Sequence, residues 1–181
     1  MIDFPIPLLG FSAYSGTGKT TLLRKLLPLF KAEGLRVAVV KHAHHSFDID
    51  HPGKDSYELR KAGADQMLVA SRHRIAFVKE TPARRAEPVL EETLALLVPD
   101  EVDLVLVEGF KQAAIQKIEL HRPALGHPLL YPHDNLIIAI ASDVPLQKKL
   151  SIPLLDLNRP DDIVTFILNT MVQPLSMESY F

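Results

Sequence analysis

Apolar runs and amphipathic stretches alternate along most of the chain. Four runs are apolar almost throughout and have the length of strands, over residues 6–11, 35–40, 102–107 and 136–141. Three stretches place apolar residues at helical spacing, over residues 21–30, 87–98 and 163–171. Strands that are apolar on both faces are typical of parallel sheets with helices on each side. The pattern therefore predicts an α/β protein with a mainly parallel sheet.

Two further stretches, residues 74–79 and 116–122, alternate apolar and polar residues with the period of a strand. This spacing predicts half-exposed strands near the sheet edges, and residues 74–79 are expected to run antiparallel to a strand at 65–70. An edge strand has unpaired backbone groups, so both stretches are candidates for pairing with a second copy in a homodimer. In the alternative arrangement, the two stretches pair with each other inside one subunit.

Shorter elements are a helix at residues 57–62 and a strand at 153–157, with a proline-rich loop at 123–133. A chain of 181 residues is long enough for one core, so residues 1–171 are predicted to form a single domain. Residues 172–181 carry no clear signal and are expected to be a mobile C-terminal tail.

Composition excludes several classes of function. The 20 Lys and Arg residues against 22 Asp and Glu give a formal net charge of -2, which argues against nucleic acid as a partner. The absence of cysteine rules out disulfides and thiolate metal sites and fits a reducing cytoplasm. No apolar run approaches the roughly 18 residues of a membrane span, and the first run leads into a polar loop rather than a cleavage site. We therefore expect a cytoplasmic protein without a membrane partner.

The turn after the first apolar run carries the main candidate chemistry. Its sequence fits G-x-x-x-x-G-K-[ST], with Ala13 in place of the first glycine. A strand enters the turn and a helix leaves it, as a phosphate-binding loop requires. Backbone N–H groups of such a loop and the positive end of the helix dipole attract phosphate. The predicted phosphate-binding residues are Ser15, Gly16, Thr17, Gly18, Lys19, Thr20 and Thr21.

Three side chains of this loop have expected roles. Lys19 is expected to reach the terminal phosphates, Thr20 to bind Mg²⁺ through its hydroxyl, and Thr21 to serve the α-phosphate. In the alternative, the loop only joins a strand to a helix and Lys19 is solvated. Together with the alternating elements, the loop predicts a P-loop NTPase-type three-layer sandwich, with a mainly parallel sheet and some antiparallel edge strands.

A second candidate lies at the end of the strand at residues 102–108, where Glu108 is followed by Gly109. Asp103 belongs to the same strand, but a rise of about 3.3 Å per residue places it roughly 16 Å away, at the other end of the sheet. Ligands bind beyond the carboxyl ends of parallel strands, so Glu108 is the predicted metal-binding and catalytic acid. It would hold Mg²⁺, directly or through water, or orient the attacking water. The alternative is an exposed acid at a strand end.

The polar run at residues 41–51 follows the second strand and is expected to face the same crevice. Lys41 and His42 are candidates for contacts with phosphate or substrate, and Asp48 or Asp50 for orienting Mg²⁺ or water. Asp50 is thus a second candidate catalytic residue. An ordinary solvated loop would explain the same residues.

Histidines in this run also allow a metal hypothesis, because imidazole binds zinc and nickel. The candidates are His42, His44, His45 and His51. Closely spaced loop histidines are a weak signal, and neither cysteine nor an H-E-x-x-H helix accompanies them.

Five segments of the chain form a more specific pattern when they are taken together. They are residues 15–22, Val40-Lys41-His42 with Phe47-Asp48, residues 53–56, residues 62–64 and Val107-Glu108-Gly109-Phe110-Lys111. Together they resemble the MobB family of molybdopterin-guanine dinucleotide biosynthesis adaptor proteins, and the resemblance covers about residues 5–170. The phosphate loop is shared by very many proteins, whereas the Lys-His and Glu-Gly-Phe-Lys segments together are much more specific.

The resemblance implies a GTP-binding protein with weak hydrolysis at most and a homodimeric habit. It also implies a supporting role in attaching GMP to molybdopterin, beside the nucleotidyltransferase that does the chemistry. Molybdopterin or its guanine dinucleotide is then an expected partner. Asp143 follows the strand at 136–141 on the ligand side, where a carboxylate can accept both donors of a guanine edge. An ordinary exposed turn acid is the alternative for Asp143.

Two other functions would use the same phosphate loop. A small-molecule kinase would add an arginine-rich lid, for which Arg72, Arg74, Arg84 and Arg85 are available, although no lid is evident. A metal-insertion GTPase would use the histidine-containing loop.

Overall fold

The computed structural model describes residues 1–43, 47–81, 87–147 and 149–172. The chain forms two compact units, of which one combines Met1–His42 with Val89–Phe181 and the other is Ala43–Pro88. Each unit contains a sheet of its own. A single domain over residues 1–171 stays a prediction.

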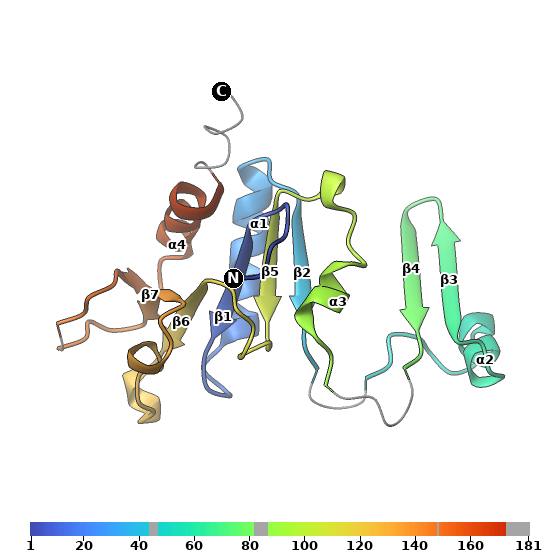
Figure 1. The fold of residues 1–181 in the computed structure, drawn as a ribbon, viewed down its shortest axis with the longest axis horizontal. Coiled ribbons are helices and arrows are strands. Elements are labelled where there is room, and N and C mark those ends of the chain that lie inside the picture. Colours follow the sequence, from blue (N-terminus) through green and yellow to red (C-terminus); the bar gives the residue numbers. More distant parts are fainter. Residues whose placement is uncertain (44–46, 82–86, 148, 173–181) are drawn as a thin grey trace. The chain divides into compact units, whose positions relative to one another are not determined.

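The first unit is built on a parallel sheet that has six strands in the described part of the chain (Figure 1). The strands are β1 (Leu8–Ser12), β2 (Val37–Lys41), β5 (Leu104–Glu108), β6 (Lys117–His121), β7 (Ile137–Ser142) and β8 (Leu154–Asp156). Their order is β2-β5-β1-β6-β7-β8, and every neighbouring pair is parallel. The α/β fold with a mainly parallel sheet is therefore confirmed.

Helices cover both faces of this sheet. They are α1 (Lys19–Ala32), α3 (Leu90–Leu94) and α4 (Pro160–Ile167), with 3₁₀ turns at Pro99–Glu101, Pro123–Leu125 and Tyr131–His133 and a π turn at Leu168–Val172. Leu104 and Leu106 of β5 belong to the core under α1 and α4, whereas Val105 and Val107 belong to the core under α3. Successive strand residues point to opposite faces, so the unit has three layers.

The helix predicted over residues 87–98 is much shorter in the structure. Only Leu90 and Leu94, one turn apart, are buried beneath α3. Val89, which the spacing also placed toward the core, is 50% exposed, whereas Leu97 packs partly buried against the same core from beyond the end of α3. Apolar spacing therefore overestimated the length of this helix, because Leu97 reaches the core from the turn that follows α3.

The prediction that residues 116–122 form a half-exposed edge strand is wrong. β6 lies between β1 and β7, and all five of its residues are buried. Its polar side chains have protein partners instead of water: Lys117 Nζ lies 3.0 Å from Asp134 Oδ2, and the Glu119 carboxylate accepts hydrogen bonds from two backbone N–H groups. Pairing of this stretch with residues 74–79 is also wrong, because β6 pairs with β1 and β7.

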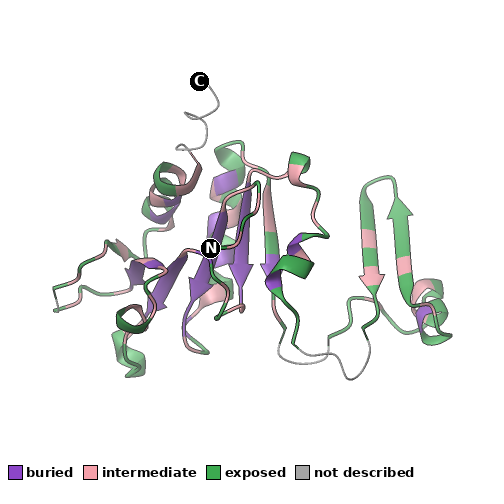
Figure 2. Ribbon diagram, in the orientation of Figure 1, coloured by how far each residue is buried: buried purple, intermediate pink, exposed green. Residues whose placement is uncertain are grey.

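In its described residues, the second unit contains α2 (Asp55–Lys61) and an antiparallel hairpin of β3 (Gln66–Ser71) and β4 (Arg74–Lys79). The predicted antiparallel pairing of these two strands is confirmed. The hairpin forms a separate two-stranded sheet and does not extend an edge of the parallel sheet. Figure 2 shows most of the hairpin exposed, in contrast to the central strands of the first unit. Over the described residues, no helix has both the length and the apolar character needed to cross a membrane.

Candidate functional site

The phosphate loop, residues 13–20, joins β1 to α1, and within it the Thr17 N–H and hydroxyl both donate to the Tyr14 carbonyl, at 3.4 and 2.9 Å. Gly16 and Gly18 have positive φ angles of 77° and 103°, which explains the need for glycine there. Ala13 is buried and has no positive φ, so it meets no strain in place of the first glycine of the pattern. The Lys19 ammonium donates to the carbonyls of Ala13 at 3.1 Å and Tyr14 at 3.3 Å, so its side chain folds back over the loop.

Positive charge gathers around Lys19. Burial lowers the pKa of Lys19, Glu108 acts in the opposite direction, and Lys111 and Lys41 lower the pKa further. Three ammonium groups and one carboxylate thus influence each other beyond the carboxyl ends of β1, β2 and β5. Such an excess of cations favours an anionic ligand.

Thr20 and Glu108, predicted as the metal-binding pair, lie together. The Thr20 hydroxyl donates to Glu108 Oε1 at 3.1 Å, and Lys41 Nζ lies 3.7 Å from Glu108 Oε2. The register of the sheet explains the contact between Lys41 and Glu108, because Lys41 of β2 is directly opposite Glu108 of β5. A hydroxyl and a carboxylate at a phosphate loop form a donor set suited to a hard divalent cation such as Mg²⁺. The metal and catalytic roles themselves stay predictions.

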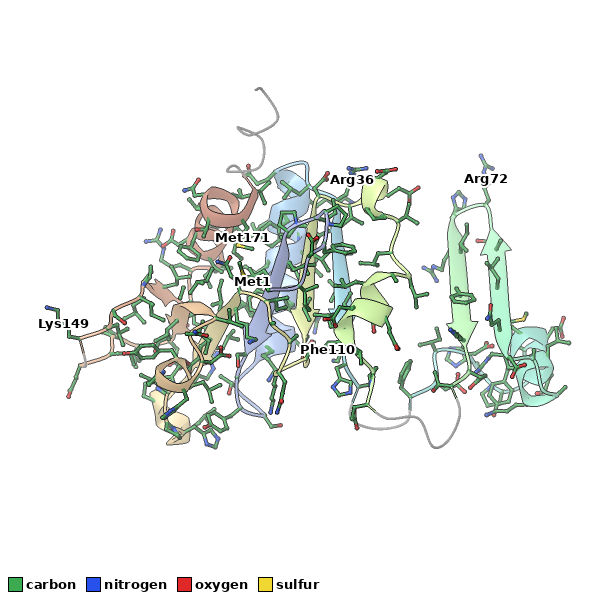
Figure 3. All side chains as sticks on the ribbon, in the orientation of Figure 1. Met1, Arg36, Arg72, Phe110, Lys149 and Met171 are labelled. Carbon is green, nitrogen blue, oxygen red and sulfur yellow. The ribbon has the colours of Figure 1, made fainter. Side chains whose placement is uncertain are left out.

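Asp103, the other acid considered for the metal role, directly precedes β5. It accepts two side-chain hydrogen bonds from Arg36, of 2.6 and 3.0 Å. Arg36 also donates to the backbone carbonyl of Asp100 at 2.7 Å. Figure 3 shows Arg36 and Phe110 at opposite ends of the sheet. Asp103 is therefore far from the phosphate loop.

The turn after Glu108 packs tightly against His42. The His42 N–H donates to the Glu108 carbonyl at 2.8 Å, and the His42 ring lies 5.1 Å from the ring of Phe110. Gly109 has a φ of 95°, and a Cβ placed on it would lie 2.9 Å from the His42 carbonyl oxygen. Backbone contact at this point holds the ends of β2 and β5 together beside the phosphate loop.

Asp50, the second predicted catalytic acid, belongs to the second unit. It accepts a hydrogen bond from the Ser56 hydroxyl at 3.1 Å and lies 3.6 Å from Arg60 Nε. The Arg60 side chain is only 5% exposed and also pairs with Asp48 at 2.7 Å and Glu80 at 2.8 Å. These ion pairs fasten the 48–50 segment to α2 and to the end of β4. A catalytic role for Asp50 stays a prediction.

Asp143, the predicted base-reading acid, follows β7 and faces Arg122 at the end of β6. Arg122 Nη1 donates to Asp143 Oδ2 at 2.6 Å, while the buried Asp143 Oδ1 has no hydrogen-bond partner among the residues that the structure describes. A pocket of about 200 Å³ adjoins this carboxylate, lined by residues 142–145 and 154–156.

Sequence reasoning missed Arg122, although its side chain touches the phosphate loop. Arg122 Nε donates to the Thr17 carbonyl at 2.9 Å, and nearby the His127 ring stacks on the Tyr14 ring with 4.3 Å between centroids. Both contacts depend on β6 lying next to β1, which the misplaced edge strand concealed. A basic residue directly after a strand was the available signal.

The alternative functions draw little support from the described residues. No group of three or more His, Cys, Asp or Glu side chains in that part of the chain could hold a metal ion. His44 and His45 lie outside it, as do Arg84 and Arg85 of the hypothetical kinase lid. Arg72 and Arg74 lie at the β3–β4 turn of the second unit.

The three-layer fold and the loop between β1 and α1 define a class, the P-loop NTPase-type α/β proteins. Comparison with known proteins gives the family. The model described as Molybdopterin guanine dinucleotide synthesis protein B matches residues 8–143. The chain therefore belongs to the MobB family, and the resemblance in the sequence is confirmed.

Individual relatives agree with this assignment. The molybdopterin-guanine dinucleotide biosynthesis adapter protein of Escherichia coli (strain K12) is 50% identical over 167 residues, which are 92% of this chain and 94% of that protein. The protein of the same name from Haemophilus influenzae is 46% identical over 91% of this chain and 89% of its own length. A crystal structure of a MobB protein homolog from Bacillus stearothermophilus is 28% identical, with a TM-score of 0.62, and covers 90% of this chain and 95% of that chain.

Proposed function

We propose that this protein is a GTP-binding adapter in molybdopterin-guanine dinucleotide biosynthesis, acting where GMP is attached to molybdopterin. Its family and the names of its relatives support the pathway. The partners in this proposal are the nucleotidyltransferase of that step and molybdopterin or its guanine dinucleotide. The absence of cysteine agrees with a cytoplasmic location.

The contact between Thr20 and Glu108 carries the nucleotide part of the proposal. Mg²⁺ bound to the Thr20 hydroxyl would be held by Glu108 directly or through water, while Lys19 and the loop N–H groups bind the phosphates. Lys41 and His42 border this position at the end of β2. Hydrolysis of GTP is proposed to be weak at most, with Glu108 orienting the water and Asp50 as a second candidate.

Base selection is assigned to Asp143. A carboxylate can accept hydrogen bonds from the two neighbouring donors of a guanine edge, whereas adenine presents no such pair. The unpartnered Oδ1 and the adjoining pocket support this assignment, since a buried carboxylate oxygen without a partner costs free energy that a donor would recover.

A homodimer is proposed to form through the hairpin of the second unit. Leu68 faces the same side as Phe77 and Ile75, and these side chains are 62%, 42% and 70% exposed. A two-stranded sheet with an exposed apolar face is marginally stable by itself. A second copy pairing there would cover the apolar face and the open strand edges.

Calorimetric titration with GTP and Mg²⁺ tests the nucleotide proposal. Lys19→Ala should lower the affinity at least about tenfold, because a charge-assisted contact contributes about 1.5–3 kcal/mol. Lys25→Ala, which removes an exposed lysine from the same helix, is the matched control and should bind like the parent. Equal affinities of the two variants would contradict the assignment of the loop. Addition of the protein to the nucleotidyltransferase reaction, with and without GTP, tests the adapter role.

A further inference from the structure

Arg122 connects two parts of the site that lie on different strands. Its Nε donates to the backbone carbonyl of Thr17 in the phosphate loop at 2.9 Å. Its Nη1 donates to the carboxylate of Asp143, beyond β7, at 2.6 Å. Its Nη2 lies 3.9 Å from the position that a Cβ on Gly18 would occupy. One guanidinium therefore reaches from the end of β7 to the backbone of the phosphate loop.

The contact with Thr17 has a consequence for the next residue. The carbonyl of Thr17 and the N–H of Gly18 belong to one planar trans peptide unit, so they point in opposite directions. A donor that holds the Thr17 carbonyl therefore also fixes the direction of the Gly18 N–H. N–H groups of this loop are the groups proposed to bind phosphate.

We propose that Arg122 is a positioning residue for phosphate binding, which aims the Gly18 N–H through the Thr17 carbonyl and is itself held by Asp143. The inference rests on the proposed nucleotide binding and adds a residue that acts without touching the ligand. It also gives Asp143 a second task, because the carboxylate that adjoins the base pocket fixes the guanidinium. The proposed base pocket and the phosphate loop are then linked through the contacts of Arg122 with Asp143 and Thr17.

The chemistry of the contact requires arginine. A planar guanidinium offers several donors in fixed directions and can serve a carbonyl and a carboxylate at the same time. Lysine keeps the charge, but its single ammonium is too compact to reproduce both contacts in the same geometry. The stacking of His127 on Tyr14 is a second contact between the segment after β6 and the phosphate loop. This segment therefore supports the loop at two points.

Arg122→Lys is the test variant, and Arg36→Lys is its matched control. Arg36 also donates to an aspartate at 2.6 Å and to a backbone carbonyl, at 2.7 Å, but it lies at the opposite end of the sheet. The ligands are GTP and inorganic tripolyphosphate, each with Mg²⁺, titrated by calorimetry. Tripolyphosphate has no base, so it reports on the phosphate loop alone. Thermal unfolding of both variants measures any common loss of stability.

We expect Arg122→Lys to weaken both ligands by a similar factor, about tenfold, while Arg36→Lys leaves both affinities within about twofold of the parent. Unchanged tripolyphosphate affinity in Arg122→Lys would overturn the inference, as would a loss confined to GTP, because Arg122 would then act only on the base. A parent protein that binds neither ligand would instead contradict the proposed function.

A measurement without ligand distinguishes failure of the Arg122 inference from failure of the proposed nucleotide binding. The amide resonance of Gly18 in a ¹⁵N–¹H spectrum reports the environment of the N–H that Arg122 is proposed to aim. This resonance should move in Arg122→Lys and stay in place in Arg36→Lys. An unmoved Gly18 resonance in Arg122→Lys would overturn the positioning role, whatever the protein binds.

Discussion

Among the glycines, Gly109 leaves the least room for an added Cβ. Any side chain there meets both the strained φ of 95° and the His42 carbonyl, 2.9 Å from the added Cβ. We expect Gly109→Ala to lower the free energy of unfolding by about 2–5 kcal/mol, the sum of backbone strain and overpacking.

Gly34 provides the control for this prediction. Its φ is 81°, but an added Cβ would meet nothing within 4 Å. Gly34→Ala should therefore cost only the backbone strain, about 1 kcal/mol. Urea unfolding of the two variants measures the difference, and equal losses would contradict the close contact between Gly109 and His42.

Asp143 yields a residue-scale prediction about specificity. If it reads the base, Asp143→Ala should reduce the preference for GTP over ATP, because each lost hydrogen bond to a charged group contributes about 1.5–3 kcal/mol. Competition between the two nucleotides gives the preference directly. Should the ratio stay that of the parent, another group selects the base.

Single residues also show how far the sequence could lead. The Thr20 and Glu108 contact follows from a motif and a strand end, both of which are local features. For Arg122 the local signal is only a basic residue directly after a strand, because its partners Thr17 and Asp143 are set by the order of three strands in the sheet. Local spacing contains no information about that order.

At the scale of elements, the alternating pattern of β6 correctly predicted a strand but placed it wrongly at an edge of the sheet. Lys117 and Glu119 alternate with apolar residues as on a half-exposed strand, yet both are buried. The structure supplies Asp134 for Lys117 and the backbone N–H groups of Leu130 and Tyr131 for Glu119. Alternation reveals which side chains are polar, but water and a polar protein partner give the same pattern.

The buried carboxylate of β6 predicts a pH dependence of stability. Burial raises the pKa of Glu119, against hydrogen bonds from the Leu130 and Tyr131 N–H groups and the charge of His121, which lower it. The folded protein then binds a proton here more tightly than the unfolded chain does. This contribution to stability is fully present when the pH is below 4.5, the ordinary pKa of a glutamate. It is lost as the pH rises through the higher pKa of Glu119 in the folded protein.

Glu119→Gln should remove this part of the pH dependence. It should also lower the free energy of unfolding by about 1–3 kcal/mol, because an amide NH₂ cannot accept the N–H that the carboxylate accepts. Urea unfolding over a pH series measures both effects, with the exposed Glu33→Gln as the control. A parallel pH profile for parent and Glu119→Gln would argue against the raised pKa.

At the scale of the whole molecule, the two units differ in how far their sheets could be predicted from the sequence. The parallel sheet of the first unit was predictable from β1, β2, β5 and β7, because their apolar runs are typical of strands covered on both faces. The separate sheet of the second unit could not be predicted from the sequence. An antiparallel pair of strands has the same alternation of apolar and polar residues whether it extends a larger sheet or stands by itself. The exposed apolar face of the hairpin is the feature that points to assembly.

Leu68→Glu tests the proposed dimer. Placing a charge on the exposed hairpin face should shift the monomer–dimer equilibrium toward monomer at tens of micromolar, as measured by sedimentation equilibrium. Leu96→Glu is the matched control, since Leu96 of the first unit is 60% exposed against 62% for Leu68. A parent that is monomeric in this range, or a dimer that both variants leave intact, would exclude this interface.

The strand order also determines when the protein can begin to fold during synthesis. β1 and β2 both pair with β5, and the register joins Leu8 to Val105. At about 5–20 residues per second, the ribosome releases β1 roughly 5–20 s before its partner exists. A nascent chain that stops before residue 104 thus contains the whole phosphate loop but lacks the strand that orders β1 and β2. During that interval, two apolar strands are open to chaperones and to aggregation.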